Sequence, residues 1–254
     1  MDTDQLSEKR FLELSERCYR ENRYTFTDFL APDELAAFYR VEPGLKAVPY
    51  SLWGGTEMAE RVMLRFGSEE MFSYEEPFPI SFLEIKPRGQ KFSEQLTHRD
   101  VLGALMSLGI TRNVLGDIFP GRDISWVICH STMVEYISRE LTVIRHTPVS
   151  VTEKPSLPEV TAAAPEIVNV PVASERIDGI IAKAFDLSRS DVTELFRKKL
   201  IFRNGRLEEN NSRLLVPGDL ITVRGFGRIR LAGFGGVSRK GKQYVELMLY
   251  GRRK

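Results

Sequence analysis

A proline-rich segment limits what the chain on either side of it can fold into. Its prolines are Pro148, Pro155, Pro158, Pro165 and Pro171. Proline lacks a backbone N–H and disfavours helical geometry at the residue before it, so the segment is incompatible with a regular helix or a central strand. We therefore expect an extended, semi-stiff linker over residues 151–171, which tethers a mobile C-terminal domain.

The two sides of this segment carry opposite net charges. Residues 172–254 hold 18 Lys and Arg against 9 Asp and Glu, a net charge of +9. Residues 1–171 hold 18 against 26, a net charge of −8. The whole-chain value of +1 hides this asymmetry. A compact basic module at one end of a chain is typical of a nucleic-acid binder.

The composition argues against a membrane or secreted protein. No apolar run approaches the roughly 18–20 residues that a spanning helix needs, and the first residues, MDTDQ, are unlike the cationic start of a secretory signal. Cys18 and Cys129 have no Cys or His partner at metal-ligand spacing. We expect a cytoplasmic protein with no membrane partner, no metal and no cofactor.

The N-terminal residues 1–76 are predicted to form a small α/β domain. Residues 4–23 have the apolar spacing of an amphipathic helix. A second helix is expected to begin at Pro32, with Asp33 and Glu34 in its first turn, where the helix dipole favours acids. Alternating polarity over residues 61–66 (RVMLRF) predicts a half-buried strand.

Residues 77–150 are predicted to form a ferredoxin-like, RRM-like domain with the order β-α-β-β-α-β. Its expected strands and helices are a strand at 80–85, a helix from the Thr97–Asp100 capping box to Gly109, strands at 114–119 and 124–129, a helix through 134–141 and a strand at 143–147. The third strand lacks the aromatic signature of RNA-recognition modules. The fold class of the whole chain is α+β.

The basic residues 172–254 are predicted to form two helices followed by strands. Ser174 is expected to cap the first helix, and Ser188 with Asp191 forms a capping box for the second. Asn204-Gly205 is a strong hairpin signal, and Pro217-Gly218-Asp219 predicts a turn before a strand at 220–223. Glycine-interrupted strands are expected after residue 224.

These elements resemble the S4-type RNA-binding domain over roughly residues 172–224. The resemblance rests on residues 176–178 (RID), Ser188-Arg189, the Asn-Gly turn and residues 218–223 (GDLITV). Such a domain presents cations from a two-helix wedge to RNA phosphates. The RNA-binding candidates are Arg176, Ser188, Arg189, Ser190, Arg197, Lys198, Lys199, Arg203, Asn204, Arg224 and Arg228. The alternative is that these are ordinary solvated surface residues.

Within this set we expect different tasks. Arg189 lies at a helix N-terminus, where the dipole disfavours a cation, so it is the first candidate for a phosphate ligand. Asp178 is expected to orient an arginine, and Gly205, Gly218 and Asp219 to shape turns. Phe226, Phe234 and Tyr244 either pack the sheet or stack on unpaired bases.

A second resemblance covers nearly the whole chain. Residues 98–110 (HRDVLGALMSLGI), 116–118 (GDI) and 224–228 (RGFGR) look like signatures of the bacterial YlmH family. The resemblance implies a ribosome-associated RNA-binding protein. Family members are linked to stalled large ribosomal subunits that still carry peptidyl-tRNA, and they are encoded near cell-division genes.

The leading hypothesis is a non-enzymatic factor in ribosome-associated quality control. Its expected partners are rRNA of the large subunit, tRNA and ribosomal proteins, with no small-molecule substrate. The alternative is an RNA-modifying enzyme of the pseudouridine synthase or rRNA methyltransferase type, for which Asp100 and Asp117 are the acids to test. A cell-division scaffold is a third possibility, without support from coiled-coil heptads.

Overall fold

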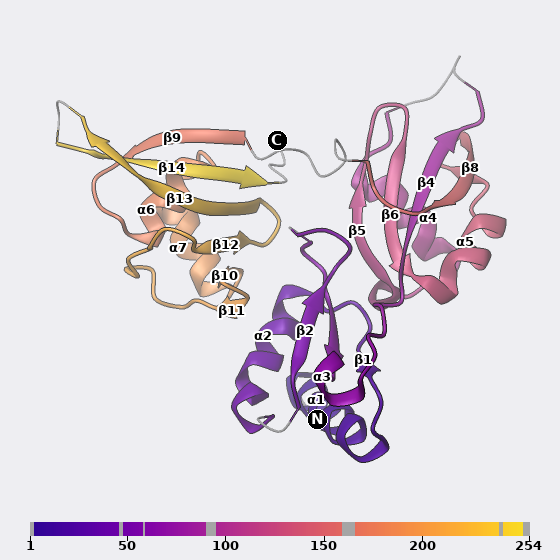
Figure 1. The fold of residues 1–254 in the computed structure, drawn as a ribbon. Helices are drawn as coiled ribbons and strands as arrows, with labels where there is room; N and C mark the ends of the chain where they lie inside the picture. The colour runs from indigo at the N-terminus through magenta and orange to yellow at the C-terminus, as the bar shows by residue number, and fades with distance from the viewer. Residues whose placement is uncertain are drawn as a thin grey trace. The chain divides into compact units, whose positions relative to one another are not determined.

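The chain forms two compact units in a computed structural model that describes residues 3–45, 48–57, 59–89, 95–158, 166–238 and 241–250. The first unit is Met1–Ala162 and the second is Ala163–Lys254 (Figure 1). Both mix helices with antiparallel sheets, in agreement with the predicted α+β class.

The N-terminal part of the first unit packs helices on a small sheet. Its elements are α1 (Thr3–Glu21), β1 (Thr25–Phe26), α2 (Pro32–Val41), the 3-10 turn η1 (Glu42–Gly44), β2 (Tyr50–Trp53), β3 (Met63–Phe66) and α3 (Glu69–Phe72). The strands pair antiparallel in the order β1-β3-β2. Helix α2 begins at Pro32 as predicted, and the Glu34 side chain accepts a hydrogen bond from the Ala31 N–H at 2.7 Å.

The rest of the first unit begins with the predicted β-α-β-β-α order, but two strands, Val143–Ile144 and Thr147–Lys154, stand where a single last strand was predicted at 143–147. Its elements are β4 (Ile80–Pro87), α4 (His98–Ser107), η3 (Arg112–Val114), β5 (Leu115–Phe119), β6 (Ser125–His130), η4 (Ser131–Met133), α5 (Val134–Glu140), β7 (Val143–Ile144) and β8 (Thr147–Lys154). The antiparallel sheet has the order β5-β6-β4-β8-β7, and α4 and α5 pack on it through one core cluster. The Thr97–Asp100 capping box is present, and Gly109 has a positive φ of 80° just after the helix.

The predicted linker is shorter than expected. Strand β8 runs to Lys154, and β9 occupies Glu166–Val172, so both ends of the predicted segment 151–171 are in sheets. The prolines are compatible with these strands because β9 is an edge strand, and Pro148 pairs with the two-residue strand β7. Residues 155–158 lie between strands, and 159–165 are outside the described residues.

A buried arginine joins the two parts of the first unit. Arg61 is 9% exposed, and its guanidinium donates to the carbonyls of Leu115 (2.9 Å), Phe29 (2.7 Å) and Arg112 (3.3 Å). Burial lowers the pKa of Arg61. Three backbone carbonyls therefore replace the water that the guanidinium loses on burial.

Apolar contacts reinforce this junction. Phe29 and Met63 from the N-terminal part pack with Ile128 of β6 in a fully buried cluster. Gly116 is required at this point because a Cβ would lie 2.9 Å from the Phe29 ring and 3.0 Å from Ile128. The face of the sheet opposite α4 and α5 is therefore partly covered by the N-terminal residues.

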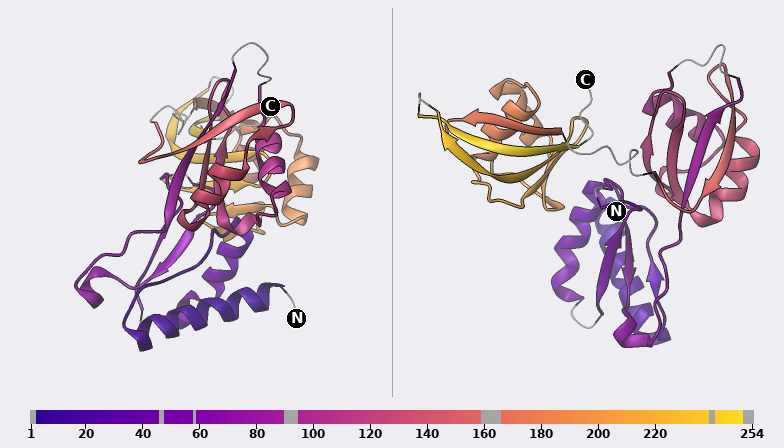
Figure 2. Two further views of the ribbon diagram at one scale, coloured as in Figure 1. Left: turned by 90° about the vertical axis from the view of Figure 1, so that its right-hand side faces the viewer. Right: turned by 45° about the horizontal axis from the view of Figure 1, so that its top comes forward.

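The second unit has one six-stranded sheet with two helices on one face. Its elements are β9 (Glu166–Val172), α6 (Ile177–Ala184), α7 (Arg189–Arg197), β10 (Ile201–Arg203), β11 (Arg206–Leu207), β12 (Leu220–Val223), β13 (Gly227–Val237) and β14 (Gln243–Tyr250). The antiparallel order is β11-β10-β12-β13-β14-β9. Both helices share a single core cluster with the sheet, and Figure 2 shows them on the same face.

The start of the first helix in this unit differs from the prediction. Helix α6 begins at Ile177 with Arg176 as its N-cap, so Ser174 does not cap it. The Ile177 N–H donates to the Arg213 carbonyl at 2.8 Å, and Arg176 forms a β-bridge with Leu214. A long-range backbone contact therefore sets the helix start, which local sequence does not reveal.

We expect Arg61→Met to lower the free energy of unfolding of the first unit by about 3 kcal/mol, because buried carbonyls lose their donor. Trp53 and Trp126 both lie in this unit and are the two tryptophans of the chain, so tryptophan fluorescence during urea unfolding reports it alone. The control Arg20→Met removes an exposed arginine 3.5 Å from Glu16 and should change stability by less than about 0.5 kcal/mol. Equal effects of the two variants would contradict the role of Arg61.

Candidate nucleic-acid interface

The first turn of α7 presents an exposed cation on a rigid cap. The Ser188 hydroxyl accepts from the Asp191 N–H at 3.1 Å, and the Asp191 carboxylate accepts from the Ser188 N–H at 3.1 Å. The hydroxyl and N–H of Ser188 hold the pKa of Asp191 below its usual value. Ser190 lies 2.7 Å from Ser188, hydroxyl to hydroxyl. Arg189 is exposed, and among the described residues its guanidinium forms no hydrogen bond or ion pair.

The start of α6 lies within electrostatic range of this turn. Arg176 forms a two-pronged ion pair with Asp178, at 2.7 and 3.1 Å, and the Gly179 N–H donates to the same carboxylate. This confirms that Asp178 orients an arginine. Burial raises the pKa of Asp178. The hydrogen bonds from Arg176 and Gly179 and the positive charge of Arg189 lower this pKa by more than burial raises it, so the net shift is downward.

The cations at the other end of α7 are paired with acids. Arg197 and Lys198 share the carboxylate of Glu194, at 2.6 Å and 3.3 Å, and these contacts lower the pKa of Glu194 to about 2, with the Arg197 bond as the main cause. Lys199 lies 3.5 Å from Glu209. The positive charge at this end is therefore partly compensated before any RNA arrives.

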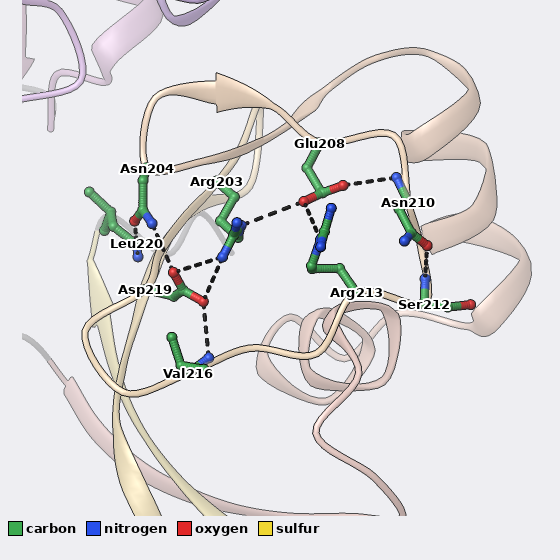
Figure 3. A network of polar contacts seen from close by, with 9 residues as sticks. All are labelled: Arg203, Asn204, Glu208, Asn210, Ser212, Arg213, Val216, Asp219 and Leu220. Carbon is green, nitrogen blue, oxygen red and sulfur yellow. Dashed lines mark hydrogen bonds and ion pairs between the residues drawn. The ribbon is translucent and has the colours of Figure 1, made fainter.

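Two candidate RNA ligands belong to a buried network around Asp219. Asp219 is 4% exposed and accepts hydrogen bonds from Arg203 (3.2 Å), the Asn204 amide (2.8 Å) and the Val216 N–H (3.0 Å). Figure 3 shows these groups converging on the carboxylate. Burial raises the pKa of Asp219, but the donors outweigh it and the net shift is downward. This gives Arg203 and Asn204 a structural task, and RNA contact by them stays a prediction.

A second carboxylate extends the network toward α6. Glu208 is 8% exposed and lies between Arg203, at 3.5 Å, and Arg213, at 3.3 Å (Figure 3). The backbone carbonyl of Arg213 in turn accepts from Ile177 at the start of α6. The loop from 208 to 218 is thus fixed both to the sheet and to the helix. Glu208 and Arg213 were not predicted from the sequence, because nothing in the neighbouring residues distinguishes them from solvated charges.

The last two candidates lie away from the helix ends. Arg224 is exposed in the turn after β12, and its N–H donates to the Leu200 carbonyl at 2.9 Å. Arg228 lies on β13 between Thr222 and Tyr250. Since its neighbour Ile229 faces the core, Arg228 lies on the sheet face opposite the helices. The candidates therefore divide into a helix-side group and a sheet-face residue.

The turn and strand predictions for this unit are confirmed. Asn204 and Gly205 both have positive φ, of 51° and 77°, and join β10 to β11. Gly218 has a φ of 95° in the turn before β12. Strands β13 and β14, which begin at Gly227 and Gln243, confirm the strands expected after residue 224.

The aromatic residues of the second unit divide between the two predicted roles. Phe226 packs against the core, with its ring 6.1 Å from that of Phe185. Phe234 and Tyr244 are 37% and 38% exposed. Packing is confirmed for Phe226, and base stacking by the other two stays a prediction.

The acids considered for catalysis have structural partners. Asp100 belongs to the capping box of α4, and Arg145 lies 3.7 Å from it. Asp117 accepts from the backbone N–H groups of Glu60 (2.7 Å) and Arg61 (3.1 Å). In the part of the chain that the structure describes, no cluster of His, Cys, Asp and Glu could hold a metal ion, and no helix is long and apolar enough to span a bilayer.

Comparison with known proteins identifies the family. Residues 74–157 match the family model described as "Putative RNA-binding domain in YlmH". The chain is 30% identical over 225 residues to ribosome-associated protein quality control protein P2 of Bacillus subtilis (strain 168), an alignment that covers 88% of this chain and 86% of the relative. The chain belongs to the YlmH family. The solved structure of the cell division protein ylmH from Streptococcus pneumoniae is 22% identical, with a TM-score of 0.48, covering 61% of this chain and 93% of that one.

The region matched by the family model differs from the candidate interface. Residues 74–157 belong to the first unit, whereas the capped turn of α7 and the Asp219 network belong to the second. Membership of the YlmH family therefore does not by itself assign the helix-side cations a role.

We expect Asp219→Asn to destabilise the second unit by about 3 kcal/mol near neutral pH, because Arg203 loses its buried partner. The folded pKa of Asp219 lies below the ordinary value of 3.8, so its contribution is complete above that value and is lost as the pH falls through the folded pKa. The gap between wild type and variant should therefore narrow below about pH 4. Both tryptophans lie in the first unit. A change in far-UV circular dichroism without a change in tryptophan fluorescence therefore reports unfolding of the second unit.

The matched control is Glu209→Gln, which removes an exposed acid 3.5 Å from Lys199 and should have little effect. A gap between wild type and Asp219→Asn that stays constant with pH would contradict the ionic role of Asp219.

Proposed function

We propose that this chain is a non-enzymatic RNA-binding factor that binds structured RNA of the large ribosomal subunit through its second unit. In this proposal the second unit is an S4-type RNA-binding domain, and residues 77–150 are a ferredoxin-like companion. The support is membership of the YlmH family, the ribosome-associated relative and the net charge of +9 over residues 172–254. The RNA-binding description of the family model belongs to residues 74–157 in the first unit, so it supports RNA binding by the chain but not the choice of the second unit.

The observation that carries the proposal is the first turn of α7. A cation there opposes the helix dipole, yet Arg189 is exposed beside two serine hydroxyls and has no acid paired with it among the described residues. The backbone N–H groups of a helix start and a guanidinium together suit a phosphate oxygen. Arg176, held by Asp178 at the start of α6, supplies a second cation nearby.

Such a site recognises RNA by shape and charge. The base edges of A-form RNA lie in a deep, narrow groove, so a rigid pair of helix starts reads phosphates and the shallow groove. We propose rRNA together with tRNA as the ligands, and a role with stalled large subunits in ribosome-associated quality control, in the cytoplasm. The acidic residues 1–171, with a net charge of −8, suit contact with basic ribosomal proteins better than with RNA.

Co-sedimentation with large ribosomal subunits over a salt series tests this function. Binding should weaken steeply with salt, and Arg189→Ala should lower the log–log slope by about one unit, because one phosphate contact is lost. The comparison variant Arg197→Ala should have a smaller effect, since Glu194 already compensates Arg197. Salt-independent binding, or a larger loss with Arg197→Ala than with Arg189→Ala, would contradict the phosphate contact.

Maps of rRNA and tRNA modifications test the non-enzymatic part. Cells without the protein are expected to keep every modification, because Asp100 and Asp117 already serve a helix cap and two backbone N–H groups. A modification that disappears, and returns with wild type but not with Asp100→Asn or Asp117→Asn, would instead establish an RNA-modifying enzyme. Folding of each variant is checked by tryptophan fluorescence.

A further inference from the structure

The sheet of the second unit has a face that its helices do not cover. Along β12, β13 and β14, residues alternate between the core and the opposite face. Ile221, Ile229, Leu247 and Leu249 belong to the core cluster with α6 and α7. Their strand neighbours therefore lie on the other face, away from the helices.

The residues at one end of this face form two rows across the strands. The first row is Thr222, Arg228 and Tyr250, and the second is Leu220, Arg230 and Met248. All six are partly exposed. The Tyr250 hydroxyl donates to the Met248 sulfur at 3.5 Å, so the two side chains lie side by side on the surface. We name these two rows the sheet-face patch.

The charge around the patch favours a polyanion. The six residues of the patch include two arginines and no acid. The next acid along β14 is Glu246, which pairs with Asn169 and Gly233 outside the two rows. Basic ribosomal proteins would be repelled by a patch that has arginines and no acids. They fit the acidic residues 1–171 better.

The patch also has the side chains that hold unpaired bases. An aromatic ring offers a stacking surface to any base, and arginines beside it contact the phosphates. Double-stranded RNA cannot use such a surface, because its bases are already stacked inside the helix. The chemistry therefore differs from that of the α7 turn, which has cations and hydroxyls but no exposed ring among the described residues.

We propose that the sheet-face patch binds an unpaired RNA segment, with a base stacked on Tyr250 and Met248 and phosphates held by Arg228 and Arg230. The inference rests on the proposed RNA-binding function. It gives the second unit two RNA-binding surfaces, one on the helix side for structured RNA and one on the opposite sheet face for a single strand.

Fluorescence anisotropy of the full chain with two labelled RNAs tests this inference. One RNA is a 12-nucleotide oligouridine, and the other is a hairpin with a short tetraloop. Tyr250→Leu should weaken oligouridine binding about tenfold, since one stacking contact is lost, and should change hairpin binding less than about twofold. Arg228→Gln with Arg230→Gln should lower the salt slope for oligouridine by about 1.4 units, since each phosphate contact on a single strand contributes about 0.7.

Two tyrosine variants serve as controls. Tyr250→Phe keeps the ring and should bind oligouridine like wild type. Tyr19→Leu removes a tyrosine that is 65% exposed on α1 of the first unit, and should also bind like wild type. Equal weakening by Tyr19→Leu and Tyr250→Leu, or by Tyr250→Phe and Tyr250→Leu, would overturn the stacking contact.

The two proposals fail in different ways. If Arg189→Ala weakens hairpin binding while Tyr250→Leu leaves oligouridine binding unchanged, the sheet-face patch is wrong and the proposed function stands. If Tyr250→Leu reduces co-sedimentation with ribosomal subunits but not oligouridine binding, the face contacts a protein and the inference is likewise overturned. If wild type binds neither RNA, both proposals fail.

Discussion

The candidate interface depends on one buried carboxylate. Asp219 joins the end of β10, the hairpin turn and the loop before β12 through Arg203, Asn204 and Val216. Through Arg203 the network reaches Glu208, and through Arg213 it reaches the first residue of α6. A buried charge with several donors contributes little net stability, but removing one partner is costly. The network therefore fixes the position of the helix starts relative to the sheet.

The first unit uses a buried cation in a comparable way. The guanidinium of Arg61 satisfies carbonyls from both parts of the unit, and burial together with the charge of Arg61 lowers the pKa of the neighbouring Arg112 to about 10. This junction covers part of the sheet face that RNA-recognition modules of the same element order use for bases. The packing of Phe29 and Met63 against Ile128 thus leaves less of this sheet face open for a ligand.

Sequence predicted the features that local chemistry determines. The capping boxes at Thr97 and Ser188, the Asn204-Gly205 turn and the order of elements all follow from spacing within a few residues. The predictions that were wrong depend on contacts between residues far apart in the sequence. The start of α6 depends on Arg213, and the strands at the ends of the proline segment depend on lying at or near sheet edges. Arg61 resembled the polar position of a half-buried strand, and only tertiary packing makes it a core residue.

The net charge of the second unit overstates the charge available to RNA. Four of the cations predicted to bind RNA are each paired with an acid. These acids are Asp178, Glu194, Glu209 and Asp219. Exposed pairs of this kind contribute little stability, but a phosphate must replace the acid before it gains the full attraction. Arg189 forms no ion pair with any acid of the described residues, so it needs no such exchange. A single cation with no paired acid can therefore contribute more to RNA binding than several paired cations. The expected contribution of each candidate residue follows from its local pairing, and not from the net charge of +9.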